Sequence, residues 1–224
     1  MEKRTALNKF IAFARRHPLL VPVAYALFYF PCFILLEKIP MLSGYYTVQF
    51  WPDEIMPFIP EFVIPYLSWF LMVPLALLFF LIAERERYFE LCFLLFTGMT
   101  VCLFIYTVFP TQVMLRHPLI NEGLCTDLIR MIREKDTCTN VLPSIHVANT
   151  VAIMLVAARS NVLKFWMKHA VNIWGIMICM STMLIDQHSI ADVLCGCGLA
   201  FFLLWTKDQI AASALLQQPA VQHK

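Results

Sequence analysis

Residues 64–83 read IPYLSWFLMVPLALLFFLIA, an unbroken apolar stretch without a charged side chain. A helix of about 20 such residues is long enough to cross the hydrocarbon core of a bilayer. The stretch ends at the charged run Glu84-Arg85-Glu86-Arg87. The sequence therefore predicts a membrane-spanning helix over residues 64–83.

Five further apolar segments extend this pattern along the chain. We predict spans at 18–36, 89–109, 144–159, 168–187 and 189–206, of which 144–159 is the shortest. The composition agrees, because the 224 residues are 60% hydrophobic, have a mean hydropathy of +0.71 and are only 14% charged, whereas soluble domains carry about 25% charged residues. We expect an all-α polytopic membrane protein, a bundle of six transmembrane helices forming one domain over residues 1–224.

Several classes of protein do not fit the composition. The first apolar run is longer than the roughly 7–15 residues of a secretory signal, so we expect it to be retained as a span. A net charge of +2 gives no reason to expect a nucleic-acid partner. The eight cysteines show no CxxC pair and no zinc-like spacing with histidine. We therefore expect neither a cofactor nor a metal ion.

The basic residues predict the orientation. Most of the 17 Lys and Arg residues fall in the segments that six spans would place on the side of the termini. Because cytoplasmic segments are enriched in Lys and Arg, we expect cytoplasmic termini. The loops 37–63 and 110–143 and the turn around Gln187 should then be outside, and we expect the plasma membrane as the location.

Two outer segments leave alternatives open. The 37–63 segment mixes aromatic residues with prolines and acids, and Trp and Tyr favour the headgroup level. We expect it to lie along the outer surface, either as a simple connector or as one wall of a path for lipids. In the 110–143 loop, Cys125 and Cys138 could form a disulfide if this face is oxidising, or remain two free thiols.

Three polar residues at the ends of apolar segments form the candidate catalytic set. His188 is followed by Asp192 at i+4, so both can share one helix face. The carboxylate can accept from one ring nitrogen and leave the other free to attack phosphorus. His146, at the outer start of another span, can protonate the leaving oxygen. The predicted topology places all three residues on one membrane face.

The neighbours of His146 predict a place for a phosphate group. Pro143-Ser144-Ile145-His146 reads as a helix start with Ser144 as its cap. Exposed amides at such a start bind phosphate. Arg116, in the outer loop, could hold phosphate oxygens through its planar guanidinium. Arg130 and Arg133 are weaker candidates and could belong to a short amphipathic piece of the loop.

These residues resemble the type 2 phosphatidic acid phosphatase (PAP2) superfamily. Its pattern combines a Lys-x6-Arg-Pro box, a Pro-Ser-Gly-His box and a Ser-Arg-x5-His-x3-Asp box. The second box is similar to Pro143-Ser144-Ile145-His146. The third is similar to Ser181-Thr182 followed, after five residues, by His188 and, after three more, by Asp192. The resemblance covers about residues 106–200 by motif and implies a six-helix membrane bundle with its site at the outer face.

The resemblance implies a role for each matching residue. His188 would form a phosphohistidine, Asp192 would orient it and His146 would protonate the leaving group. Arg116, Ser144 and the amides after it would hold the phosphate. Pro143 and Ser181, which open the two boxes, complete the predicted substrate-binding set.

The chain departs from the pattern where two cations are expected. The first-box Lys falls at Phe109 and the third-box Arg is Thr182, while Arg116 is followed by His117 before Pro118. The Pro-Ser-x-His box with Thr182 in place of Arg, together with Phe109-Pro110-Thr111 before the loop Arg, resembles the branch that includes inositol-phosphoceramide and sphingomyelin synthases, whose members move a phospho-alcohol headgroup between lipids.

The leading hypothesis is a membrane lipid phosphatase that hydrolyses a lipid phosphate or pyrophosphate ester through a phosphohistidine. The first alternative is a headgroup phosphotransferase acting on phospholipids. A monoester dianion needs more positive charge than a diester monoanion, so the missing cations favour this alternative. The second alternative is a non-catalytic lipid-binding or lipid-moving protein on the same scaffold.

Overall fold

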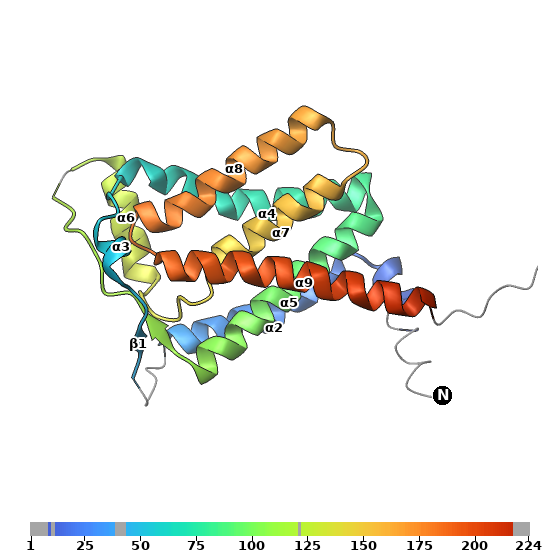
Figure 1. The fold of residues 1–224 in the computed structure, drawn as a ribbon, viewed down its shortest axis with the longest axis horizontal. Coiled ribbons are helices and arrows are strands. Elements are labelled where there is room, and N and C mark those ends of the chain that lie inside the picture. Colours follow the sequence, from blue (N-terminus) through green and yellow to red (C-terminus); the bar gives the residue numbers. More distant parts are fainter. Residues whose placement is uncertain (1–8, 10–11, 39–43, 121, 217–224) are drawn as a thin grey trace, which may run out of the picture.

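A computed structural model describes residue 9 and residues 12–38, 44–120 and 122–216 (Figure 1). It contains a long helix at each of the six predicted positions. These helices are α2 (Leu20–Lys38), α4 (Val63–Ala83), α5 (Arg85–Val108), α7 (Ile145–Arg159), α8 (Phe165–Leu184) and α9 (Ile190–Leu216).

Four of the candidate spans are long and apolar enough to cross a membrane: Leu20–Lys38, Pro60–Ala83, Arg85–Val108 and Ile190–Ser213. The prediction of six spans is thus supported for four. Helix α7 has 15 residues, about 22 Å at 1.5 Å per residue, against a hydrocarbon core of about 30 Å. Helix α8 is longer but carries Lys168, His169 and Asn172 near its start.

The prediction of an all-α fold needs one small correction. Strands β1 (Tyr46–Thr47) and β2 (Thr111–Gln112) pair in parallel, with Tyr46 opposite Thr111 and Thr47 opposite Gln112. The segment before α4 also contains the short helix α3 (Trp51–Glu54) and the 3-10 turn η1 (Pro60–Phe62). The 110–143 loop contains α6 (Leu124–Lys135), the amphipathic piece predicted there.

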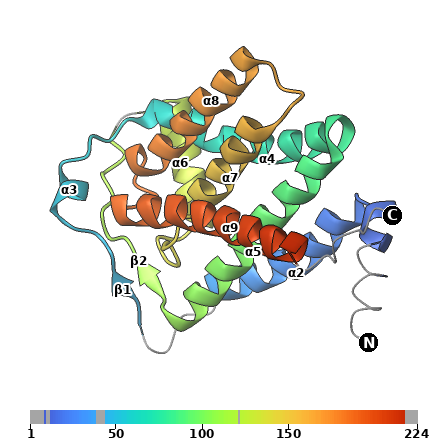
Figure 2. The same ribbon diagram turned by 45° about the vertical axis from the view of Figure 1, so that its right-hand side comes forward.

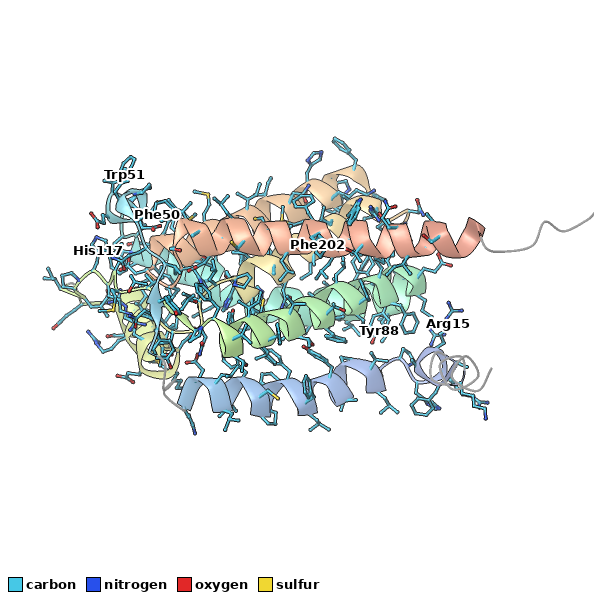
Figure 3. All side chains as sticks on the ribbon, turned by 60° about the horizontal axis from the view of Figure 1, so that its bottom comes forward. Arg15, Phe50, Trp51, Tyr88, His117 and Phe202 are labelled. Carbon is cyan, nitrogen blue, oxygen red and sulfur yellow. The ribbon has the colours of Figure 1, made fainter. Side chains whose placement is uncertain are left out.

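The connecting elements gather at one end of the bundle. Figures 1 and 2 show β1, β2, α3 and α6 together there, next to the starts of α7 and α9. In Figure 3, Phe50, Trp51 and His117 lie at this end, while Arg15 and Tyr88 lie at the opposite end. The predicted outer loops thus share one end, and which side of the membrane that end faces stays a prediction.

Helix α9 is longer than predicted, and its charged residues pair with residues of neighbouring helices. The predicted span ended at Lys207-Asp208, but the helix continues to Leu216. Lys207 Nζ lies 2.5 Å from a carboxylate oxygen of Glu90 on α5, and Arg159 Nη2 at the end of α7 lies 2.6 Å from Asp208. These ion pairs join α5, α7 and α9 at the end opposite to the loops.

Helix α7 forms the centre of the core. It packs against α5, α8 and α9, and most of its residues are buried. Its contact with α9 is close at Gly196. A Cβ atom at this position would lie 2.8 Å from the carbonyl oxygen of Ser144 and 3.1 Å from Val147 Cβ. A backbone oxygen cannot move aside as a flexible side chain can, so only glycine fits here.

We predict that Gly196→Ala destabilises the protein by about 1–3 kcal/mol, because the extra methyl group overpacks the contact between α7 and α9. Gly198→Ala is the matched control: it is two residues away on the exposed face, and its Cβ atom would have no neighbour within 4 Å. Thermal unfolding in detergent should show a lower midpoint for Gly196→Ala only. Equal midpoints for the two variants would contradict the close contact.

Candidate active site

The turn between α8 and α9 holds His188 in a fixed position. The main-chain N–H groups of Gln187 and His188 both donate to the carbonyl oxygen of Thr182, each at 3.0 Å. Asp186 has a positive φ of 60°, a conformation that Asp tolerates better than most residues. Its carboxylate accepts from the His117 N–H at 2.8 Å and from Arg133 Nη2 at 3.0 Å. The 110–143 loop therefore braces this turn.

The imidazole of His188 pairs with the carboxylate of Asp192, as predicted from their spacing. His188 Nδ1 lies 3.3 Å from Asp192 Oδ2, and the Asp192 side chain is fully buried. The same oxygen accepts from the Ser189 N–H at 2.8 Å, while Ser189 Oγ accepts from the Asp192 N–H at 3.2 Å. This reciprocal pair is a capping box that starts α9, so one carboxylate both caps the helix and orients the histidine.

His146 faces the same region from the first turn of α7. Ser144 caps this helix as predicted, with its Oγ accepting from the Val147 N–H at 3.4 Å. The His146 ring lies between Tyr66 and Trp69, with centroid distances of 4.6 Å and 4.3 Å. Its centroid is 6.1 Å from that of His188. The Nε2 atom of His146 is buried and has no hydrogen-bond partner among the described residues.

Main-chain hydrogen bonds join the starts of α7 and α9. The Ser144 N–H donates to the carbonyl oxygen of Asp192 at 3.1 Å. On the other side, Asp53 of α3 accepts from the Ile190 N–H through Oδ1 at 2.7 Å and from the Phe50 N–H through Oδ2 at 3.0 Å. Asp53 could not be identified from the sequence, because a polar residue in a loop carries no sign that it will be buried beside the start of a distant helix.

The two histidines line a cavity of about 250 Å³. One wall is aromatic and is formed by helices α2, α4 and α5. The other wall is polar and comes mainly from the segment between α6 and α7. The aromatic residues are Tyr29, Phe30, Phe33, Trp69, Phe70 and Tyr106, and the polar ones besides the histidines are Glu37, Lys135, Asp136, Thr137, Thr139, Asn140 and Gln187.

The predicted phosphate-binding residues lie outside the lining of this cavity. Arg116 Nη2 donates to the carbonyl oxygen of Asp136 at 3.4 Å. Ser144 is occupied as a helix cap, and the Pro143 carbonyl oxygen accepts from Tyr106 OH at 2.6 Å. Ser181 Oγ donates to the Ile178 carbonyl inside α8. The structure thus brings together His146, His188 and Asp192. The other four residues form hydrogen bonds with the protein outside the cavity lining.

Asp136 is a cavity residue that the motifs did not indicate. It follows α6 directly, and its Oδ2 accepts from the hydroxyl group of Tyr66 at 3.1 Å. Burial raises the pKa of the Asp136 carboxyl, against the opposing effects of His188, the Tyr66 hydrogen bond and Arg116. Lys135 supplies the positive charge on this wall. Lys135 is the last residue of α6 and Asp136 is its C-cap, and neither belongs to one of the motifs.

The two loop cysteines are free thiols in the structure. Cys125 packs beside Val63, Tyr66 and Ile129, whereas Cys138 lies near Arg116, and burial raises the pKa of its thiol. The free-thiol alternative therefore describes this structure. Within the described ranges, no group of three or more His, Cys, Asp and Glu side chains is arranged to hold a metal ion.

The family model that matches this chain is that of the PAP2 superfamily, over residues 118–213. The matched range contains His146, His188 and Asp192 and begins just after Arg116. No curated protein and no solved structure matches the chain. The family match agrees with the resemblance at the level of the superfamily and suggests an enzyme of the phosphatase or phosphotransferase type.

We predict that Asp53→Ala lowers the free energy of unfolding by about 1 kcal/mol, because the partly buried N–H groups of Phe50 and Ile190 lose their acceptor. Glu54→Ala, at the exposed neighbouring position of α3, is the control and should change little. Hydrogen exchange should also become faster at residues 188–192 in Asp53→Ala alone. Unchanged exchange there would show that Asp53 does not support the start of α9.

Proposed function

We propose that the protein is a membrane enzyme of the PAP2 type that cleaves a lipid phosphoester through a phosphohistidine at His188. One observation carries this proposal. His188 Nδ1 is held by the buried carboxylate of Asp192, while the His188 ring and His146 line one cavity. A membrane bundle with such a pair is suited to nucleophilic attack on phosphorus.

The roles of the two paired residues follow from the chemistry of imidazole. When Nδ1–H donates to Asp192, the tautomer is fixed and the lone pair is on Nε2. Nε2 then attacks phosphorus, and the leaving alkoxide departs on the opposite side. Asp192 stabilises the positive charge that the ring acquires when the P–N bond forms. We propose that His146, at the start of α7, protonates this leaving oxygen.

The aromatic wall favours a lipid as the substrate. Phe30 on α2 and Phe70 on α4 both line the cavity, yet they are 57% and 60% exposed. The aromatic wall therefore reaches the side of the bundle that would face lipid. An acyl or isoprenyl chain can lie between α2 and α4 while its phosphate reaches the histidines.

We propose water as the acceptor, which makes the protein a lipid phosphatase acting on a phosphate or pyrophosphate ester. Water needs no binding site of its own. In the proposed topology the site is on the extracytoplasmic face of the plasma membrane and the termini are cytoplasmic, as the distribution of Lys and Arg favours.

Headgroup transfer is the second candidate, and the charge of the cavity favours it. The lining contains one ammonium group, Lys135, against the carboxylates of Glu37 and Asp136. Thr182, where the family pattern has Arg, is fully buried and donates to the Cys179 carbonyl. A monoanionic diester requires less positive charge than a monoester dianion. The third candidate is a lipid-binding protein that catalyses no reaction.

We predict that His188→Ala reduces turnover by at least about 1,000-fold, because the nucleophile is lost while the fold stays intact. His169→Ala, exposed on α8, is the control and should keep the wild-type rate. Mass spectrometry of the products identifies the reaction, with phosphatidic acid, isoprenyl pyrophosphate and intact phospholipids offered together with diacylglycerol and ceramide.

Each outcome of this experiment has one meaning. Free phosphate and dephosphorylated lipid support the phosphatase. A new headgroup-bearing lipid without free phosphate supports the transferase. If the wild-type chain forms neither a product nor a phosphoenzyme, the remaining alternative is a lipid-binding protein without catalytic activity. Full activity in a folded His188→Ala variant would contradict the phosphohistidine mechanism.

A further inference from the structure

A groove lies at the end of the bundle opposite to the proposed active site, the end at which Figure 3 shows Arg15 and Tyr88. Its volume is about 1090 Å³, larger than that of the cavity beside His188. The start of α5, the end of α9 and the segment before α2 form its walls. The reaction proposed for His188 does not use this α5/α9 groove.

Cations outnumber carboxylates on the polar side of the α5/α9 groove. The lining contains the carboxylates of Glu86 and Glu90 and twice as many cations. The cations are Arg15, Arg85, Arg87 and Lys207. The cavity beside His188 has the opposite balance, because Lys135 faces the carboxylates of Glu37 and Asp136 there. The α5/α9 groove therefore favours an anionic ligand more than the proposed active site does.

Two of these cations are not neutralised by the protein. Arg87 Nη1 and Lys207 Nζ each lie 2.5 Å from a carboxylate oxygen of the buried Glu90. Arg15 and Arg85, in contrast, form no ion pair with any residue that the structure describes. The only side-chain hydrogen bond between them runs from Arg85 Nη2 to the carbonyl oxygen of Arg15, at 3.1 Å. Most N–H groups of these two exposed guanidinium groups are therefore available to an anion.

The apolar side of the groove leads from these cations along a candidate membrane span. Arg85, the first residue of α5, is followed at steps of four by Phe89 and Phe93, which also line the groove. Residues at this spacing share one helix face, and each step advances about 6 Å along the axis. The groove thus presents a cation at the helix start and then two phenyl rings, the order of the headgroup and chain of a phospholipid.

The protein holds the segment before α2 against this groove without a ligand. Besides the Arg85 hydrogen bond to the Arg15 carbonyl, the hydroxyl group of Tyr88 donates to the carbonyl oxygen of Pro18 at 2.7 Å. Tyr88 is buried on α5, so its hydrogen bond gives the segment a fixed attachment. Because Arg15 is already kept beside Arg85, binding an anion between them requires little further ordering of the chain.

We propose that the α5/α9 groove is a binding site for an anionic phospholipid, separate from the proposed active site. The phosphate of the lipid binds Arg15 and Arg85, and one of its chains lies along Phe89 and Phe93. Arginine suits this role because its planar group donates two parallel hydrogen bonds to phosphate oxygens. Basic pockets between membrane helices bind anionic headgroups in the same way. A soluble phosphate compound would leave the apolar side of the groove uncovered, whereas a lipid chain covers it.

The test titrates lipid into the purified full chain in detergent and counts the bound molecules by native mass spectrometry. Every chain tested carries His188→Ala, so that the proposed reaction cannot consume the lipid. Dioleoyl phosphatidylglycerol is compared with dioleoyl phosphatidylcholine, which has the same chains but no net charge. We expect the dissociation constant to be lower by about tenfold or more for phosphatidylglycerol, because the unpaired cations attract only an anionic headgroup.

Two double variants locate the binding site. Arg15→Gln combined with Arg85→Gln should remove the preference for phosphatidylglycerol. Arg16→Gln combined with Lys164→Gln is the matched control, because it removes two exposed cations that do not line the groove, and it should keep the preference. None of these four cations forms an ion pair with a described residue, so both double variants should unfold at the same temperature without lipid. Phosphatidylglycerol should then raise the unfolding midpoint of the control only.

Three results would overturn the inference. Equal affinity for the two lipids would show that the groove does not select an anion, and equal losses in the two double variants would show that Arg15 and Arg85 do not form the site. Displacement of phosphatidylglycerol by an excess of glycerol 3-phosphate, which has no chains, would show that the site takes a soluble anion and not a lipid. A wild-type chain without enzymatic activity would contradict the proposed function but not this site, so the two failures are distinguishable.

Discussion

Asp192 accepts hydrogen bonds from the His188 ring and from the Ser189 N–H through one carboxylate oxygen, and its own carbonyl oxygen accepts from the Ser144 N–H. The first contact orients the candidate nucleophile and the second starts α9. The third joins the starts of α9 and α7. Because one buried residue makes all three contacts, the direction of His188 and the distance to His146 are set together.

Contacts elsewhere in the bundle hold α7 and α9 in this arrangement. Gly196 lets α9 approach the first turn of α7 closely, while Asp53 satisfies the next free N–H group of α9 from the loop side. At the far end, Glu90, Arg159, Lys207 and Asp208 join α5, α7 and α9 by ion pairs. The short central helix α7 is therefore held at both ends.

Features that depend on neighbouring residues in the sequence could be predicted. Apolar length predicted helices at all six positions, the i+4 spacing predicted the His188–Asp192 pair, and Ser144 was recognised as a helix cap. Features that depend on contacts between residues far apart in the sequence could not be predicted. Lys207 and Asp208 look like the end of a span until their partners on α5 and α7 are known. Asp53 and Asp136 look like ordinary acidic residues of loops, because the sequence around them does not indicate that distant segments bury them.

The exposed positions of Phe30 and Phe70 at the edge of the cavity have a consequence for kinetics. A substrate that arrives between α2 and α4 comes from within the lipid layer, by diffusion in two dimensions. The concentration that governs its binding is then its mole fraction in the membrane and not its amount per volume of buffer. Inert lipid or detergent would compete simply by dilution, so the saturation curve would change with the composition of the bilayer at constant total substrate.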